Sequence, residues 1–396
     1  MRQCHHVGKC MNILIYKWDI FPYNDIINEL KKQGHSMDVL AFPVKNHIQD
    51  SAFEKKLAEY LENGSYNAVF SVNYFTVISN TCHKYGIPYI SWTCDAPLAG
   101  MRNPSIYNTV NTIYVFDYKE YEYFKNAGAS TVKYLPLAGA PERTASLLTQ
   151  NGICINNRKY SYDISFVGNL YDKNRYDEMV NALPLYLCGY MDATVEAQLN
   201  VSGGNIINIM LTDDIMENAS KYMDLKQGGK NLEELKLYFA TSVLSYKAAA
   251  IMRRQALNAL SRVADMHLFT TSSTDGLFKT IVHPPVKYHS EMPLVFAASK
   301  INLNMTTPNI EDGIPLRVFD ILSAGGFLMT DYRPGLEKLF DIGKDLVVYD
   351  GINDLANKAH YYLNHDKERE LISASGFDKL QKLHTYKHRV QAMFSL

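Results

Sequence analysis

The chain has 396 residues, a length that suits two or three domains of ordinary size. Hydrophobic residues make up 47% of the sequence and charged residues 20%, a composition that excludes a generally disordered protein. The formal net charge of −1 argues against a general nucleic-acid binder and against attachment to anionic lipid through bulk charge. An anion site, if there is one, must therefore be local.

The sequence has no run of 18 apolar residues, and its first residues lack the apolar core of a signal peptide. The six cysteines are scattered without a C-x-x-C pair, which favours reduced thiols and a cytoplasmic protein with at most peripheral membrane contact. Residues 1–10 are interpreted as a flexible leader, with a zinc clip of Cys4, His5, His6 and Cys10 as the alternative.

Short apolar runs alternate with amphipathic helical patterns over residues 11–140. The runs predicted as strands are 11–16, 38–42, 68–72, 88–92, 112–116 and 132–135. Helical spacing occurs at 24–33, 51–62 and 75–85. This rhythm predicts a first α/β domain with a parallel sheet and helices on both faces.

The same rhythm returns in the second half of the chain after a polar segment, 141–160, that is predicted to be a linker. A second α/β domain is expected over 161–375, with a helical insertion at about 175–262 and a C-terminal helix, 376–396, that packs back towards the first domain. Its predicted strands are 163–167, 266–270, 301–305, 327–330 and 346–349. Two such domains would face each other across a cleft, with ligands outside the carboxyl ends of the strands.

The most informative stretch is 311–326, EDGIPLRVFDILSAGG. Pro315 suits the first turn of a helix, and Gly325 with Gly326 suits its end. Asp312, Gly313 and Ile314 would then present free backbone N–H groups at a helix N-terminus, which attracts phosphate or another anion.

Charged side chains in the same stretch fit a sugar–diphosphate–ribose ligand. Arg317 would reinforce the positive helix end with its planar fork of donors, unless it forms only a surface ion pair. Asp320, one turn later, could accept hydrogen bonds from paired ribose hydroxyls, as acidic residues do in dinucleotide folds.

The spacing of Asp312 and Asp320 resembles the E-x7-E element of group 1 glycosyltransferases of the GT-B fold, with both Glu replaced by Asp. The segment 299–389 resembles the CgeB-like, spore-maturation-type branch in the pieces SKINLNMT, GIPLRVFDILSAGGFLMTDYRPGLEKLF, YYLNHDKEREL and HTYKHR. The earlier piece IPYISWTCDAP resembles the domain that precedes it in that branch. The resemblance implies an α/β protein of two Rossmann-like domains, with a nucleotide-sugar donor in the second and an acceptor in the first.

Carried onto this sequence, the resemblance implies that Asp320 binds the donor ribose and that Asp312 approaches the transferred sugar. The family's phosphate loop reads G-R-L and then Lys, and here Gly168 and Asn169 begin the corresponding segment. Lys173 and Arg175 flank the expected Lys position, and our hypothesis is that Arg317 and Arg175 share the diphosphate charge.

Two further residues are candidates for the predicted site, and one charged pair nearby is interpreted as lying outside it. Asp95 follows the strand 88–92 and could orient the acceptor hydroxyl or act as a base; the alternative is a cap of the next turn. Tyr288 lies where the resemblance places the nucleotide base, so it is a stacking candidate or simply a packed tyrosine. Glu337 and Lys338 are interpreted as a solvated helix face.

These features predict a bacterial hexosyltransferase that uses a nucleotide sugar, expected to be UDP-linked, and needs no cofactor. No Asp-x-Asp motif occurs, which favours metal-independent transfer, and the resemblance implies retention of anomeric configuration. The acceptor, whether protein, cell-surface glycan or small molecule, is not specified, and nucleic acid is not expected. A nucleotide-sugar epimerase of the same fold and a non-catalytic nucleotide-sugar-binding scaffold are the alternatives.

Overall fold

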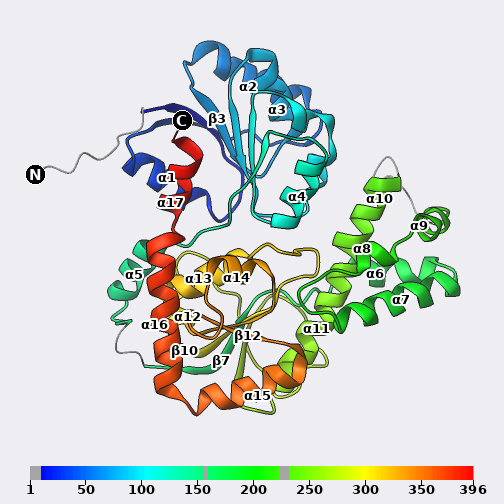
Figure 1. The fold of residues 1–396 in the computed structure, drawn as a ribbon, viewed down its shortest axis with the longest axis vertical. Coiled ribbons are helices and arrows are strands. Elements are labelled where there is room, and N and C mark those ends of the chain that lie inside the picture. Colours follow the sequence, from blue (N-terminus) through cyan, green and yellow to red (C-terminus); the bar gives the residue numbers. More distant parts are fainter. Residues whose placement is uncertain (1–9, 156–158, 223–231, 396) are drawn as a thin grey trace, which may run out of the picture. The chain divides into compact units, whose positions relative to one another are not determined.

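The computed structural model describes residues 10–155, 159–222 and 232–395. The predicted leader and its zinc alternative lie outside these residues, except for Cys10. The chain divides into two compact units, each built on one six-stranded sheet (Figure 1). The N-terminal unit is Met1–Ala138 with Leu383–Leu396, and the C-terminal unit is Gly139–Lys382.

All strands of the N-terminal unit are parallel and run in the order β2-β1-β3-β4-β5-β6. They are β1 (Asn12–Tyr16), β2 (Ser36–Leu40), β3 (Ala68–Val72), β4 (Tyr89–Trp92), β5 (Asn111–Val115) and β6 (Val132–Tyr134). The helices are α1 (Tyr23–Lys32), α2 (Ser51–Asn63), α3 (Thr76–Tyr85), η1 (Ala99–Arg102), η2 (Pro104–Tyr107), α4 (Tyr118–Asn126) and α17 (Tyr386–Phe394). The strand order reverses between β1 and β3, which is the topological switch point of this sheet.

The end of the chain packs onto the sheet of the N-terminal unit. In α17 the Phe394 ring lies 5.6 Å from that of Phe70 in β3, between ring centroids. The guanidinium of Arg389 donates to the carbonyl oxygens of Pro136 and Leu137 at 2.7 and 3.2 Å. Both carbonyls belong to the segment that follows β6. The last helix therefore hydrogen-bonds to residues 253 and 252 positions earlier in the sequence.

The C-terminal unit has the strand order β12-β11-β10-β7-β8-β9, also fully parallel. Its strands are β7 (Tyr162–Val167), β8 (Met266–Phe269), β9 (Ile281–His283), β10 (Ser299–Asn304), β11 (Leu328–Asp331) and β12 (Val347–Tyr349). This is the Rossmann order, with its switch point between β7 and β10. All predicted strands of both halves are confirmed to within two residues; β9 was not predicted, because three partly exposed residues at a sheet edge carry no apolar pattern.

Helices cover this second sheet and also form the predicted insertion. Around the sheet lie α5 (Pro141–Gln150), α12 (Met292–Ala297), α13 (Leu316–Ser323), α14 (Gly335–Leu339), α15 (Gly351–Leu363) and α16 (Asp366–Leu383). The insertion contains α6 (Arg175–Met179), η3 (Val180–Ala182), α7 (Leu185–Leu199), α8 (Ile207–Met210), α9 (Asp213–Ser220), α10 (Leu232–Tyr238), the π-helix η4 (Phe239–Leu244) and α11 (Ser245–Leu260).

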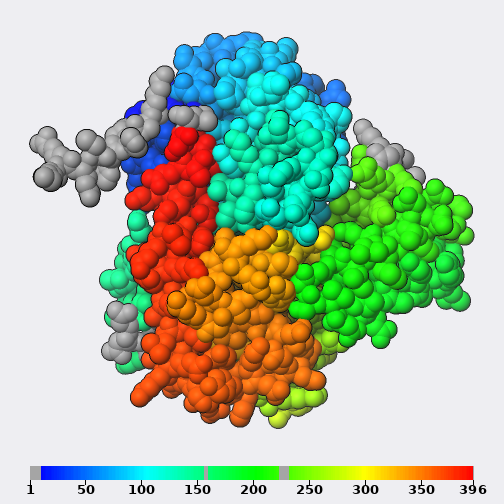
Figure 2. Space-filling view, in the orientation of Figure 1, coloured from blue at the N-terminus to red at the C-terminus, as the bar shows by residue number. Residues whose placement is uncertain are grey.

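The insertion has a hydrophobic core of its own, and α11 links it to the sheet. Ala248 near the start of α11 packs in the insertion core, whereas Leu257 and Leu260 near its end pack in the core of the sheet. Figure 2 shows the insertion, in green, as a lobe beside the orange part of the same unit. Because one continuous helix contributes to both cores, the insertion is joined to the sheet by packing as well as by the chain.

Two of the predicted boundaries need correction. The segment 141–160 was expected to be an irregular linker, but α5 occupies its first half and buries Pro141, Thr144 and Leu148. The prediction missed this helix because most of its residues are polar and only the buried positions follow a spacing of three and four residues. The expected single helix over 376–396 is divided between α16 and α17, because Thr385 forms a capping box that starts a new helix.

Candidate functional site

The stretch 311–326 lies where the sequence analysis placed it, at the start of a helix near the carboxyl ends of the second sheet. Helix α13 begins at Leu316, so Pro315 is the residue before the helix and not part of its first turn. Gly325 has a φ of 62°, the left-handed conformation that ends a helix and that glycine adopts without strain. The predicted helix and its glycine stop are confirmed.

The N-cap residue of α13, Pro315, makes no side-chain cap hydrogen bond. Pro315 has no hydroxyl, amide or carboxylate with which to accept a hydrogen bond from the first turn, and its neighbours Gly313 and Ile314 are buried. The first backbone N–H groups of a helix have no partner within the helix, and they carry its partial positive charge. This geometry suits an anion at the start of α13.

Asp320 is held by two of the residues that the sequence analysis selected. The Tyr288 hydroxyl donates to Oδ1 of Asp320 at 2.6 Å, and Nη1 of Arg317 lies 3.6 Å from Oδ2. The side chain of Asp320 is 9% exposed. Tyr288 therefore meets the carboxylate through its hydroxyl, a contact that the sequence analysis did not foresee, and its stacking on a base stays a prediction.

Arg317 lies along α12 and keeps its guanidinium partly open. Its guanidinium carbon is 5.4 Å from the ring centroid of Phe296, and Nη1 also contacts the sulfur of Met292. A quarter of the side chain is exposed. An arginine that packs its flat face on apolar groups and leaves part of its fork open is already oriented for an anion.

Asp312 is far more enclosed than a surface-loop carboxylate. The residue is 3% exposed, and the Lys338 ammonium lies 2.7 Å from Oδ2. A Cβ on Gly335 would come within 2.0 Å of the Asp312 carbonyl oxygen, so only glycine at 335 permits α14 to approach this loop. Lys338 is exposed, as the interpretation of a solvated helix face requires, and its ammonium also lies beside the first of the two aspartates.

The loop after β7 and the start of α6 contain the other predicted donor-binding residues. Gly168 follows the strand directly; Asn169 is exposed, and its Oδ1 accepts from the Ser272 hydroxyl at 3.1 Å. Lys173 is exposed, and Arg175 opens α6, where it pairs with Glu178 at 2.8 Å.

Arg253 on α11 is a buried cation that the sequence analysis missed. Nη1 donates to the carbonyl oxygen of Asn169 at 2.5 Å and Nη2 to that of Met305 at 2.7 Å. These carbonyls follow β7 and β10, the two strands of the switch point, so one guanidinium bridges it. Burial lowers the pKa of Arg253, and the nearby charge of Arg317 lowers it further.

A signal for Arg253 was present in the sequence. The residue stands four positions after Ala249 and four before Leu257, both of which are buried on one face of α11. A charged residue in the apolar stripe of an amphipathic helix must find internal partners, since burial without them is costly. That position could have marked Arg253 as a site residue.

The candidate in the N-terminal unit, Asp95, is exposed just beyond β4. Asn73, at the end of β3, donates from Nδ2 to Oδ2 of Asp95 at 2.7 Å and accepts from the Cys94 backbone N–H at 2.8 Å. Asn73 has a φ of 62°, an unusual value for a residue other than glycine. The carboxylate of Asp95 is therefore fixed by a neighbouring strand, and its catalytic role stays a prediction.

No group of three or more His, Cys, Asp or Glu residues that could hold a metal ion occurs within residues 10–155, 159–222 and 232–395. No helix in these ranges is long and apolar enough to cross a membrane.

Part of the chain matches a known protein family in sequence. Residues 253–395 match a family described as "Glycosyl transferase-like". No curated protein matches the chain in sequence.

Solved structures match nearly the whole chain at low sequence identity. A sucrose-phosphate synthase from Thermosynechococcus elongatus has a TM-score of 0.51 and 10% identity, over 96% of this chain and 97% of that chain. A UDP-forming α,α-trehalose-phosphate synthase from Burkholderia xenovorans has a TM-score of 0.51 and 12% identity, over 98% and 99%. Anabaena HepE, solved in complex with UDP-glucose, has a TM-score of 0.51 and 11% identity, over 97% and 98%.

At these identities the structural matches establish the fold. The two parallel six-stranded sheets with their helices match glycosyltransferase structures of the GT-B type. The chain thus has the fold of GT-B glycosyltransferases, and its residues 253–395 match the glycosyl transferase-like family in sequence.

Proposed function

We propose that the protein is a UDP-sugar-dependent glycosyltransferase that moves a hexose to an unidentified acceptor in the cytoplasm. The observation that carries the proposal is the N-terminus of α13 with Arg317 beside it and Asp320 one turn later. This group lies within the residues that match the glycosyl transferase-like family. The complex of Anabaena HepE with UDP-glucose supports UDP as the nucleotide.

Each part of a UDP-sugar has a suitable partner in this arrangement. The diphosphate would accept hydrogen bonds from the first N–H groups of α13 and from Arg317. Asp320, already oriented by Tyr288, would accept from the ribose hydroxyls. Asp312, with Lys338 beside it, would lie near the transferred sugar, in direct contact or through a water molecule.

Glycosyl transfer from UDP requires stabilisation of the negative charge that builds on the leaving diphosphate. The positive end of α13 and the partly open guanidinium of Arg317 are fixed before the reaction begins, so they can stabilise that charge without rearrangement. The buried charge of Arg253 adds to the same field from the switch point. In this proposal these groups do the work of a divalent cation, and transfer is metal-independent.

The proposed outcome is retention of anomeric configuration, in which the departing phosphate accepts the proton of the acceptor hydroxyl. In that case the chain needs no strong base of its own, and Asp95 orients the acceptor. An inverted product would instead make Asp95 the base.

The test is ligand-induced stabilisation followed by product analysis. In buffer with EDTA, UDP and one UDP-hexose should raise the melting temperature, since a ligand that binds only the native state stabilises it. Arg317→Ala should remove most of this shift, whereas Lys367→Ala, which deletes an exposed cation on α16, should preserve it.

Product analysis then separates the proposal from its competitors. Incubation of the UDP-hexose with acceptor mixtures should release UDP and give a glycoside of unchanged anomeric configuration by NMR. A nucleotide sugar isomerised without acceptor would indicate an epimerase, and tight binding without turnover on any acceptor would indicate a scaffold. An unchanged affinity for UDP in Arg317→Ala would contradict the donor site itself.

A further inference from the structure

The C-terminal unit contains a pocket of about 500 Å³ that lies between the helical insertion and the carboxyl ends of β11 and β12. One wall is the end of α7 and the loop after it, a second is the face of α11 with Met252 and Gln255, and the third is formed by residues 331–333 and 349–353. Its size is within the range of small-molecule sites. None of the predicted donor-binding residues lines it.

The charges of the pocket disfavour an anionic ligand. Its one cation, Arg333, lies 3.0 Å from a carboxylate oxygen of Asp331, and both residues are buried. The same carboxylate accepts from the backbone N–H and the hydroxyl of Thr306 at 2.8 and 2.9 Å. The other charged lining residues are the carboxylates Glu196 and Asp350, both exposed, so the open part of the pocket is electronegative.

The polar lining is otherwise neutral and rich in amides. Gln255, Asn353 and Ser202 are exposed and make no hydrogen bond to another described residue, so their donors and acceptors are available to a ligand. Asn200 uses its amide nitrogen on the Glu196 carbonyl oxygen at 3.0 Å. An amide both donates and accepts, which matches a hydroxyl group that does the same.

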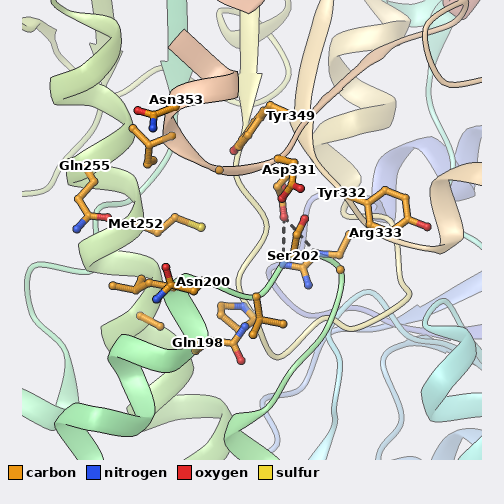
Figure 3. A pocket seen from close by; sticks show the side chains of 18 of the residues that line it. Gln198, Asn200, Ser202, Met252, Gln255, Asp331, Tyr332, Arg333, Tyr349 and Asn353 are labelled. Atoms are coloured by element: carbon orange, nitrogen blue, oxygen red, sulfur yellow. Dashed lines mark hydrogen bonds and ion pairs between the residues drawn. The ribbon is translucent and has the colours of Figure 1, made fainter. Parts of the chain in front are cut away.

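Apolar surfaces complete the lining between these amides. Met252 and the ring of Tyr349 come from opposite walls, and Tyr332 packs against the loop at Gly203, where a Cβ would lie 2.5 Å from the ring. In Figure 3 the labelled side chains surround a central space, with Met252 and Gln255 on one side and Asp331 and Arg333 on the other. Flat apolar groups beside amides suit a molecule with both C–H faces and hydroxyl edges.

Arg333 also retains hydrogen-bonding capacity at the wall of the pocket. Its Nε donates to Asp331 at 3.2 Å and Nη2 to the Thr306 carbonyl oxygen at 3.3 Å. Nη1 is buried and has no hydrogen-bond partner among the described residues. Nη1 of Arg102, outside the pocket, is in the same condition, so Arg333 is part of the pocket wall and the exposed amides carry the recognition of a ligand.

We propose that this pocket binds a neutral saccharide of one or two rings, at a site separate from that of the UDP-sugar donor. The unpaired amides of Gln255 and Asn353 hydrogen-bond its hydroxyls, and Met252 and the tyrosines contact its C–H faces. The proposal concerns binding alone, so it stands or falls independently of transfer activity.

The test is saturation-transfer NMR on the full chain with maltose, cellobiose, lactose and N,N′-diacetylchitobiose. At least one disaccharide should bind saturably, and excess UDP should not displace it. Asn353→Ala and Gln255→Ala should each weaken binding about fivefold, as expected for one lost hydrogen bond. The matched controls Asn357→Ala, on the same helix as Asn353, and Gln381→Ala on α16 remove exposed amides outside the pocket and should change nothing.

Three results would overturn the proposal. The first is absence of binding by every disaccharide at roughly tens of millimolar. The second is displacement by UDP, or equal binding by the pocket variants, which would move the saccharide to another site. The third is binding of only charged probes, glucose 6-phosphate or glucosamine, which would assign the pocket to an ion.

Discussion

Each of the two units has a parallel, doubly wound sheet. The switch point of that sheet is bridged by a neutral side chain in one unit and by a cation in the other. In the N-terminal unit the gap between β1 and β3 is bridged by a neutral group, the Trp18 indole, which donates to the Val72 carbonyl oxygen at 2.8 Å. In the C-terminal unit the guanidinium of Arg253 bridges β7 and β10. Both groups meet the same need, since backbone carbonyl groups at the strand ends require hydrogen-bond donors.

The charge of the bridging group, neutral in one unit and positive in the other, favours different ligands at the two sheet edges. The C-terminal edge combines the charge of Arg253 with Arg317 and the start of α13, a field suited to a diphosphate. The N-terminal edge offers the Asn73 amide and the Asp95 carboxylate, which suit hydroxyl groups. Under the proposed function the nucleotide sugar belongs to the C-terminal edge and the acceptor to the N-terminal edge, so each variant below should affect only one of these functions.

The largest effect is expected from Asp320→Ala at the C-terminal edge. Loss of a carboxylate that accepts hydrogen bonds costs about 1.5–3 kcal/mol, so UDP affinity measured by calorimetry should fall roughly 10- to 100-fold. Asp320→Asn keeps an acceptor for Tyr288 and should lose less. UDP affinity unchanged in both variants would break the assignment of this edge to the donor.

A smaller loss is expected from Arg253→Lys. Lysine retains the charge but cannot reach two carbonyls with one planar group, so the loops after β7 and β10 lose a common donor. We expect UDP affinity to fall about tenfold, with a lower melting temperature. Arg254→Lys, at the next position of α11, is the matched control; an equal loss of UDP affinity there would deny Arg253 a specific role.

Asn73→Gly tests the N-terminal edge. Glycine tolerates the φ of 62°, so the variant removes the amide that holds Asp95 without adding backbone strain. Turnover at saturating UDP-sugar should fall about fivefold, the value of one hydrogen bond, while UDP affinity stays constant. A change in UDP affinity instead of turnover would contradict the separation of the two edges.

Sequence patterns were sufficient for the strands, for α13 and for the carboxylates near it, because these depend on local periodicity and on caps. They were insufficient for the partners that pack around them. Lys338 and Arg253 reach the site from α14 and α11, and the contact of Tyr288 with Asp320 spans 32 positions. Such contacts are decided by how helices pack, which no short window of sequence specifies.

The same limit applies to Arg253, which contacts the loop after β7 although the two are far apart in the sequence. Arg175 follows the G-x-L segment in the sequence, but α6 turns it outward to Glu178, whereas Arg253 returns to that loop from 84 positions away. The role of Arg175 at the diphosphate stays a prediction. The position of Arg253 in the apolar stripe of α11 is the sequence feature that indicates its burial.

The last prediction concerns the stability of the N-terminal unit and no binding function. Glu120 on α4 is buried, accepts from the Leu98 backbone N–H at 3.3 Å, and has its pKa raised to about 8, mainly by burial and then by the nearby charge of Asp117. Because this folded-state pKa exceeds the unfolded value, the contribution of Glu120 to stability is fully present below the unfolded pKa of about 4.5. It is lost as pH rises towards 8.

Glu120→Gln should remove this dependence, since glutamine can still accept from Leu98 and carries no charge to bury. At pH 8 the variant should be more stable than the unmodified chain by about 1 kcal/mol or more, with a higher midpoint in urea, and the advantage should shrink towards pH 5. Glu122→Gln, two residues away and exposed beside Lys119, should leave the pH profile as it was. An equal gain at both pH values would show that Glu120 is not protonated in the folded protein at either pH.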